Sequence, residues 1–212
     1  MNSVERATAA AWQAQSLLLG YPDEQLLGRL DLLTQVSGTL DEAVGAPLRR
    51  FLEHLRTTQP GQLAADYVAT FDHRKRCCLF LTYYAHGDTR NRGMALLSLK
   101  QTYAADGLLL VDDELPDHLC VVLEYAAARP DRGRALLLEH RAGLELLRLA
   151  LQDAGSPWAD LLDSVSATLP PLAGDLRDAV AKLAAQGPPE EQVGLAPFAP
   201  PEYMPQPQGA LR

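Results

Sequence analysis

The sequence has few cysteines, no long apolar run and no signal-peptide pattern, and each absence narrows the class of protein. Its three cysteines are Cys77, Cys78 and Cys120. Because their number is odd and two are adjacent, a disulfide framework is excluded and a reducing cytoplasm is expected. No apolar run approaches the roughly 20 residues that a membrane-spanning helix needs, and the N-terminus has no apolar segment followed by a cleavage site. We therefore expect a soluble cytoplasmic protein that does not insert into a membrane.

Positive charge and aromatic residues are also scarce. The 19 Lys and Arg are outnumbered by 27 Asp and Glu, which gives a formal net charge of −8. A chain of this balance lacks the clustered cations that grip phosphate backbones, so nucleic acid is excluded as a partner. Leu and Ala dominate the 47% hydrophobic content, while β-branched and aromatic side chains are sparse. This composition favours helix over sheet.

The apolar positions recur at helical spacing along most of the chain, and we expect a single all-α domain over residues 1–186. Residues 187–212 contain seven prolines, and we expect them to form an extended or disordered tail. The expected helices cover residues 3–19, 23–36, 41–56, 60 to about 71, 74–84, 88–106, 116–129, 131–154, 158–169 and 175–186.

Motifs of catalysis are missing from this sequence. It has no G-x-S-x-G, no P-loop and no dinucleotide fingerprint, so we expect no catalytic residue. His73 and Cys77 would share a face of a helix, at the spacing of a pair of metal ligands. Cys78 would point about 100° away from Cys77, and no C-x-x-C pair exists. We therefore interpret the cysteines as packing residues and expect no metal site.

Two charged clusters and one aromatic pair leave alternatives open. The basic cluster consists of His73, Arg74, Lys75 and Arg76, followed by Arg90 and Arg92. It is typical of a solvated helix end whose arginines pair with Asp72 or Asp88, or of a site for a phosphate-bearing ligand or an acidic partner. The acidic loop of Asp112, Asp113, Glu114 and Asp117 precedes His118. Such a loop is typical of metal binding or of acid–base chemistry, or of a structural carboxylate, here Asp117 in the first turn of a helix begun by Pro116. Tyr67 and Phe71 form an i, i+4 aromatic pair, which is typical of a core or of a groove for a peptide helix.

Five pieces of sequence stand in a fixed order between residues 60 and 128. They are Y-V-A-T-F from Tyr67, D-H-R-K-R-C-C-L-F-L-T-Y-Y from Asp72, G-D-T-R-N-R-G from Gly87, E-L-P-D-H from Glu114 and V-V-L-E-Y from Val121. In this combination the chain resembles the NarJ family, dedicated chaperones of respiratory nitrate reductase within the TorD/DmsD group of redox enzyme maturation proteins. The first and fourth pieces match the Y-x-x-x-F and E-P-x-D-H patterns of that group, although the proline here stands one place later.

The resemblance implies an all-helical TorD/NarJ-like fold and a cytoplasmic chaperone that is not an enzyme. Such proteins bind the apo form of the catalytic α subunit of nitrate reductase, notably its N-terminal segment. They hold it ready for insertion of the molybdenum bis-guanine-dinucleotide cofactor, which they do not bind stably themselves. The alternative function is a direct carrier of that cofactor through the basic cluster. The oligomeric state, monomer or dimer, is left open.

The resemblance also implies roles for particular residues. Client contact is carried over to Tyr67, Phe71, Glu114, Asp117 and His118. Contact with the cofactor or an acidic partner is assigned to Arg74, Arg76, Arg90 and Arg92. We hypothesise an apolar groove beside the aromatic pair that accepts an amphipathic client helix, with Asp113, Glu114 and Asp117 at its rim to meet basic residues. His118 would make binding sensitive to pH. The apolar and acidic patches should then converge in space.

Overall fold

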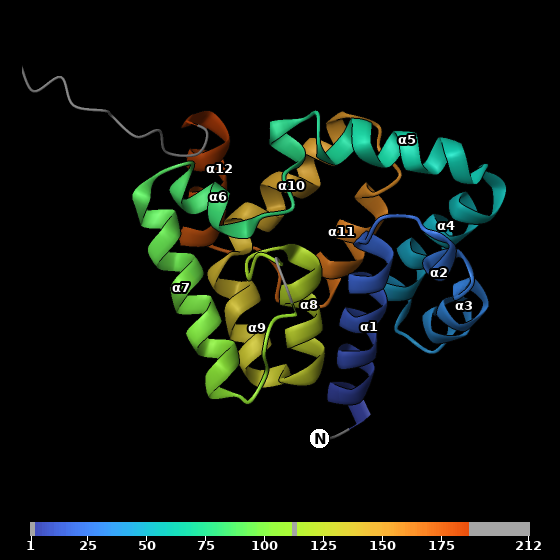
Figure 1. Ribbon diagram of the computed structural model, residues 1–212, viewed down its shortest axis with the longest axis horizontal. Coiled ribbons are helices and arrows are strands. Elements are labelled where there is room, and N and C mark those ends of the chain that lie inside the picture. Colours follow the sequence, from blue (N-terminus) through green and yellow to red (C-terminus); the bar gives the residue numbers. More distant parts are fainter. Residues whose placement is uncertain (1–2, 112–113, 187–212) are drawn as a thin grey trace, which may run out of the picture.

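Helices make up all the regular structure that the computed structural model describes, which covers residues 3–111 and 114–186 (Figure 1). The α-helices are α1 (Ser3–Leu19), α2 (Glu24–Leu27), α3 (Leu30–Gly38), α4 (Glu42–Thr57), α5 (Pro60–Phe71), α6 (Leu81–His86), α7 (Arg90–Ala105), α8 (Leu119–Ala128), α9 (Pro130–Glu139), α10 (Arg141–Asp153), α11 (Ala159–Ala167) and α12 (Asp175–Gln186). A short 3-10 turn, η1 (Lys75–Cys77), precedes α6. The all-α fold predicted from the sequence is confirmed, and the predicted tail at 187–212 lies outside the described residues.

Helix α1 packs against α8 and α11 near the middle of the molecule (Figure 1). Its broad apolar face buries Trp12, Leu18 and Leu19 completely or nearly so. Opposite them, Leu119 and Leu123 of α8 are equally buried. Side chains of this size each contribute roughly 1.5–3 kcal/mol when they leave water, so this interface is a major source of stability.

Polar side chains tie α1 to its neighbours inside the core. The Trp12 indole N–H donates to Thr168 Oγ1 at 2.9 Å. The Gln15 side-chain amide donates to Ser164 Oγ at 2.8 Å, and that hydroxyl donates to the Val44 carbonyl at 2.8 Å. Because buried polar groups are costly unless paired, this chain of bonds fixes the register of α1, α11 and α4.

Two helices predicted as continuous are interrupted. The helix expected over residues 23–36 divides at Gly28, which ends α2; glycine is among the least favourable residues inside a helix. The helix expected over residues 131–154 divides at His140, whose backbone leaves the helical region. The break lets α10 turn so that Arg141 and Glu145 bury an ion pair of 2.9 Å, and the Arg141 guanidinium bonds Ser166 Oγ on α11 at 2.8 Å.

Two further predictions were wrong at the segments that precede α6 and α8. Residues 74–84 do not form one helix, because η1 and an extended stretch at Cys78 and Phe80 come before α6. The helix expected from Pro116 begins instead at Leu119, as α8, and Pro116 lies in a turn before it. No helix within 3–111 or 114–186 is long and apolar enough to cross a membrane.

Candidate functional site

The two segments that were predicted as helix instead pair with each other. Leu81 N–H donates to the Asp117 carbonyl at 3.0 Å, and Leu119 N–H donates to the Leu79 carbonyl at 2.8 Å. Between them, Phe80 and His118 form an isolated antiparallel bridge. We call residues 78–81 and 116–119 the paired loops. Their backbone groups bond across the pair, where a continuous helix would have used them internally, and this explains why local patterning misplaced the helix starts.

Asp117 lies at the centre of the paired loops and is completely buried. Its Oδ2 accepts a short hydrogen bond from the Thr82 hydroxyl and a second from the Thr82 N–H at 3.3 Å. The Arg92 Nη2 lies 3.7 Å from the same oxygen. Asp117 therefore does not lie at the exposed rim that was hypothesised for it. Its carboxylate binds the first turn of α6, where unpaired N–H groups favour negative charge.

Arg92 of α7 completes this buried cluster. Its Nε donates to Thr82 Oγ1 at 3.3 Å, its Nη1 lies 3.3 Å from Asp88 Oδ1, and its guanidinium carbon stands 5.6 Å from the centre of the Phe80 ring. One of the alternatives left open by the sequence, pairing with Asp88, thus holds for this arginine. Arg90, two residues earlier and therefore on another face of α7, is exposed.

His118 caps α8 with its imidazole. Nδ1 accepts from the Cys120 N–H at 3.3 Å, and the ring packs edge-on against Phe80 with centroids 5.2 Å apart. Burial lowers the pKa of His118 below its usual value, and the nearby Asp117 carboxylate opposes that shift only in part. Since an imidazolium has no free acceptor nitrogen, the cap requires the neutral ring.

Acidification through the usual histidine pKa, near 6.5, is expected to destabilise the protein. In the unfolded chain His118 binds a proton more readily than in the fold, so its contribution is complete above that pH and is lost as pH falls below it. We expect His118→Asn to reduce the pH dependence between pH 7 and 5 by up to about 1.4 kcal/mol per pH unit, because asparagine also caps helices but does not titrate. Urea unfolding at several pH values measures this.

His140 provides a matched comparison, because burial lowers its pKa also. His140→Asn should reduce the slope in the same direction, and the double variant should reduce it further. A slope in His118→Asn that equals the wild-type slope would show that the His118 cap does not govern acid stability.

The aromatic pair belongs to a larger cluster. Tyr67 and Phe71 lie 4.8 Å apart between ring centroids, and both pack edge-on against Trp158, at 5.8 and 5.6 Å. Tyr21, after the end of α1, adds an edge contact to Tyr67 at 5.4 Å. We call Tyr21, Tyr67, Phe71 and Trp158 the aromatic cluster. Trp158 is buried, Tyr67 and Phe71 are half-buried, and Tyr21 is 51% exposed, so the cluster runs from core to surface.

Tyr67 also connects two helices through its hydroxyl, which donates to the Leu19 carbonyl at the end of α1 at 3.2 Å. Burial raises the pKa of Tyr67 well above its usual range, and the neighbouring Cys120 and Asp72 act in the same direction. The phenol is therefore protonated at any physiological pH and serves as a donor.

Two glutamates act electrostatically on Cys120, the second residue of α8. Burial raises the pKa of the Cys120 thiol to about 12, followed in size by the charge of Glu114, with a smaller effect of Glu124. Cys120 in turn acts electrostatically on Tyr67. Glu114 and Glu124 are both exposed. The charges of Glu114 and Glu124 thus act on Cys120 at the start of α8, whereas Asp112 and Asp113 lie outside the described residues. The convergence of the acidic and apolar patches stays a prediction.

The cysteines fit the packing role expected of them. Cys77 is buried and Cys78 and Cys120 are partly buried, all as free thiols. His73 is exposed and does not share a helix with Cys77, so the proposed helical pair does not form. Within the described part of the chain, no group of three or more His, Cys, Asp or Glu side chains is arranged to hold a metal ion.

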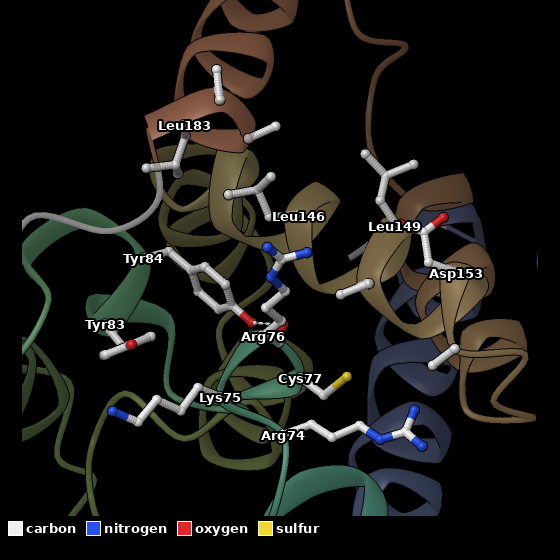
Figure 2. A pocket seen from close by; sticks show the side chains of 14 residues that line it. Arg74, Lys75, Arg76, Cys77, Tyr83, Tyr84, Leu146, Leu149, Asp153 and Leu183 are labelled. Carbon is white, nitrogen blue, oxygen red and sulfur yellow. Dashed lines mark hydrogen bonds between the residues drawn. The ribbon is translucent and has the colours of Figure 1, made fainter.

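A pocket of about 790 Å³ lies on another part of the surface, between η1, α6, α10 and α12. Figure 2 shows the Arg76 side chain reaching into it beside Tyr84 and Leu146, with Arg74 and Lys75 at its edge. The Tyr84 hydroxyl holds this turn by donating to the Arg76 and Cys78 carbonyls at 3.0 and 2.9 Å. The basic cluster predicted from sequence is therefore divided, since Arg74 and Arg76 line the pocket while Arg92 bonds to Thr82.

Several important residues were not identified from the sequence. Thr82 bonds to Asp117, and Trp158, just before α11, closes the aromatic cluster about 90 residues downstream of Tyr67. Arg92 was a candidate, but its contact with Asp117 was not predicted. Trp158 had a sequence signal, because large aromatics are rare in this chain and usually have a specific packing role. Thr82 had none, because an isolated threonine in an apolar segment resembles many others.

Known proteins resemble this chain over most of its length. Residues 37–163 match a family model described as the nitrate reductase delta subunit. The probable nitrate reductase molybdenum cofactor assembly chaperone NarJ of Bacillus subtilis is 33% identical over 171 residues, which cover 80% of this chain and 92% of that protein. The assembly chaperone NarJ of Escherichia coli K12 is 36% identical over 152 residues, covering 70% of this chain and 64% of that protein.

Two further similarities concern a longer protein and a solved structure. Nitrate reductase-like protein NarX of Mycobacterium tuberculosis is 40% identical over 159 residues, 74% of this chain, and the match spans only about a quarter of NarX, 24%. A crystal structure of a putative redox enzyme maturation protein from Archaeoglobus fulgidus superposes with a TM-score of 0.56 at 20% identity, covering 86% of this chain and 94% of that one. That structure supports the fold.

Proposed function

This chain belongs to the nitrate reductase delta subunit family, and we propose that it is an assembly chaperone for the catalytic α subunit of a respiratory nitrate reductase. The observation that carries the proposal is the similarity to two NarJ chaperones over 70–80% of the chain, which confirms the predicted family. Those relatives are named for molybdenum cofactor assembly. They support a non-catalytic role in which this chain promotes insertion of the cofactor into the client.

We further propose that the client's N-terminal segment binds as an amphipathic helix beside the aromatic cluster. Tyr21 and the half-buried rings of Tyr67 and Phe71 offer apolar surface, and such surface accepts the i, i+3, i+4 anchors of a helix. Glu114 supplies exposed negative charge near Cys120. Charge at the edge of an apolar site mainly sets orientation and association rate, so a client segment with basic residues on its polar face fits best.

Some residues of the paired loops are proposed to position this site without contacting the client. Asp117 is buried and holds Thr82 and Arg92, so we assign it a positioning role in place of the predicted contact. His118 caps α8 and thereby fixes the helix that carries Cys120. Glu114, Tyr67 and Phe71 remain the proposed contact residues, and we keep the cytoplasm as the proposed location.

Calorimetric titration with a peptide of the α-subunit N-terminal sequence tests this assignment. We expect Phe71→Ala to weaken binding by roughly 10- to 100-fold, as removal of an anchor ring does. Glu114→Gln should weaken it several-fold, and less so at high salt. Tyr67→Phe keeps the ring and removes only the bond to Leu19, so it should retain most of the affinity. Leu32→Ala, at an exposed leucine of α3, is the matched control; equal affinity in all variants would refute the assignment.

A second candidate function, direct carriage of the guanine-dinucleotide cofactor, is favoured by Arg74 and Arg76 at the pocket of Figure 2. One guanidinium group can donate two parallel hydrogen bonds to two oxygens of a phosphate. The two functions separate on binding of a guanine nucleotide, which the carrier hypothesis requires to be salt-dependent and to be lost in Arg74→Ala and Arg76→Ala. The involvement of Arg92 with Asp88 and Asp117 removes one of the four arginines that this hypothesis counted.

A further inference from the structure

The pocket between η1, α6, α10 and α12 combines basic and apolar surface. Arg74, Lys75 and Arg76 are exposed at η1, and none of the three makes an ion pair within the described residues. On the opposite wall, Leu146 and Leu149 of α10 and Leu183 of α12 line the pocket, together with the exposed carboxylate of Asp153 beside Leu149 (Figure 2). Leu149 is 38% exposed. Three cations outnumber the single carboxylate of Asp153 on the pocket lining. Such an excess of positive charge beside apolar side chains predicts an occupant that is both acidic and apolar.

We propose that the occupant is the segment of this same chain that follows α12, residues 187–212. Helix α12 forms one wall of the pocket, with Leu183, Ala184 and Ala185 on its lining, and it ends at Gln186. The segment therefore starts at the pocket itself. Its sequence carries Glu190, Glu191 and Glu202 against one cation, Arg212, and its apolar residues include Val193, Leu195 and Phe198.

Reach and tethering both favour this occupant. Glu190 and Glu191 follow Ala185 by five and six residues, and an extended chain of that length spans at most about 17–22 Å, enough to bring a carboxylate to Arg74 or Arg76 across a pocket of about 790 Å³. A short tether gives an effective concentration in the millimolar range. A weak complementary contact is then sufficient for the segment to bind in the pocket.

Photocrosslinking in the full chain tests the proposal. A benzophenone side chain placed at Leu149 should crosslink to residues 187–212 of the same molecule, at a yield that does not depend on protein concentration. The same group at Leu32, exposed on α3, is the control and should not reach the segment. We expect Glu190→Lys with Glu191→Lys to lower the yield about fivefold, as does Arg74→Glu with Arg76→Glu, because each change turns attraction into repulsion.

Combining the two double variants restores opposite charges and should recover the yield, a result that a folding defect would not give. Helical circular dichroism of each variant checks that the fold persists. Crosslinks that are absent from the segment, insensitive to charge reversal, or formed between two molecules in proportion to concentration would overturn the proposal. No client is present in the experiment, so its failure would leave the proposed chaperone function intact.

Discussion

Replacement of Asp117 by alanine is expected to lower the free energy of unfolding by about 3 kcal/mol, since removing one partner of a buried charged cluster leaves the others uncompensated. Thr82 would lose the acceptor of its hydroxyl and of its N–H, and Arg92 would lose the carboxylate 3.7 Å away. Urea unfolding should show an earlier midpoint at an unchanged slope.

Glu114→Ala is the matched control for Asp117→Ala, because both residues belong to the same predicted motif but Glu114 is exposed. Its unfolding midpoint should stay within the roughly 0.5 kcal/mol scatter of surface substitutions. The two variants should also differ in client binding. Glu114→Ala should weaken binding in a fully folded protein, whereas Asp117→Ala should lose binding in parallel with the fold. Equal stability of the two variants would contradict the buried role of Asp117.

Gly133→Ala is expected to be the most damaging single-methyl addition. A Cβ added at Gly133 of α9 would overlap the Cα of Ala126 in α8, and it would lie 2.5 Å from the Cβ of Ala126. Backbone atoms cannot move aside as a flexible side chain can, so α8 and α9 must separate. We expect a loss of about 3 kcal/mol or more, at the upper end of overpacking costs, measured by thermal or urea unfolding.

Gly93→Ala on α7 is the control for that substitution. Nothing lies within 4 Å of the Cβ position at Gly93, and alanine lowers the entropy of the unfolded chain. We therefore expect a gain of about 0.5–1 kcal/mol. If Gly133→Ala were equally benign, the close approach of α8 and α9 would be wrong.

The helical parts of the fold were predictable because their signals are local. The stretch from Asp175 to Gln186 was predicted with the observed ends, and the helix begun by Pro60 also starts where it was expected. In both cases the signal lies within one segment: Pro60 stands in the first turn of α5, and Asp175 and Asp178 stand in the first turn of α12. The prediction failed at the paired loops for the opposite reason. Leu119 donates its N–H to the carbonyl of Leu79, which lies 40 residues earlier in the sequence.

The candidate site was predictable in composition but not in arrangement. Glu114 and Asp117 were placed together at an acidic rim with His118 beside them, yet the structure exposes the first, buries the second and makes the third a helix cap. Alternation of exposure within a turn depends on which neighbour a side chain meets, and Thr82 and Cys120 could not be assigned as those neighbours from spacing alone.

The central claim, that this chain holds an apo nitrate reductase α subunit through its N-terminal segment, is tested most directly by co-purification. The full chain would be tagged in cells that cannot complete the molybdenum cofactor, so that the α subunit stays in its apo form. We predict that the intact α subunit is retained, and that an α subunit lacking its N-terminal segment is recovered at a small fraction of that amount. Equal recovery of the two forms, or retention of neither, would contradict the account.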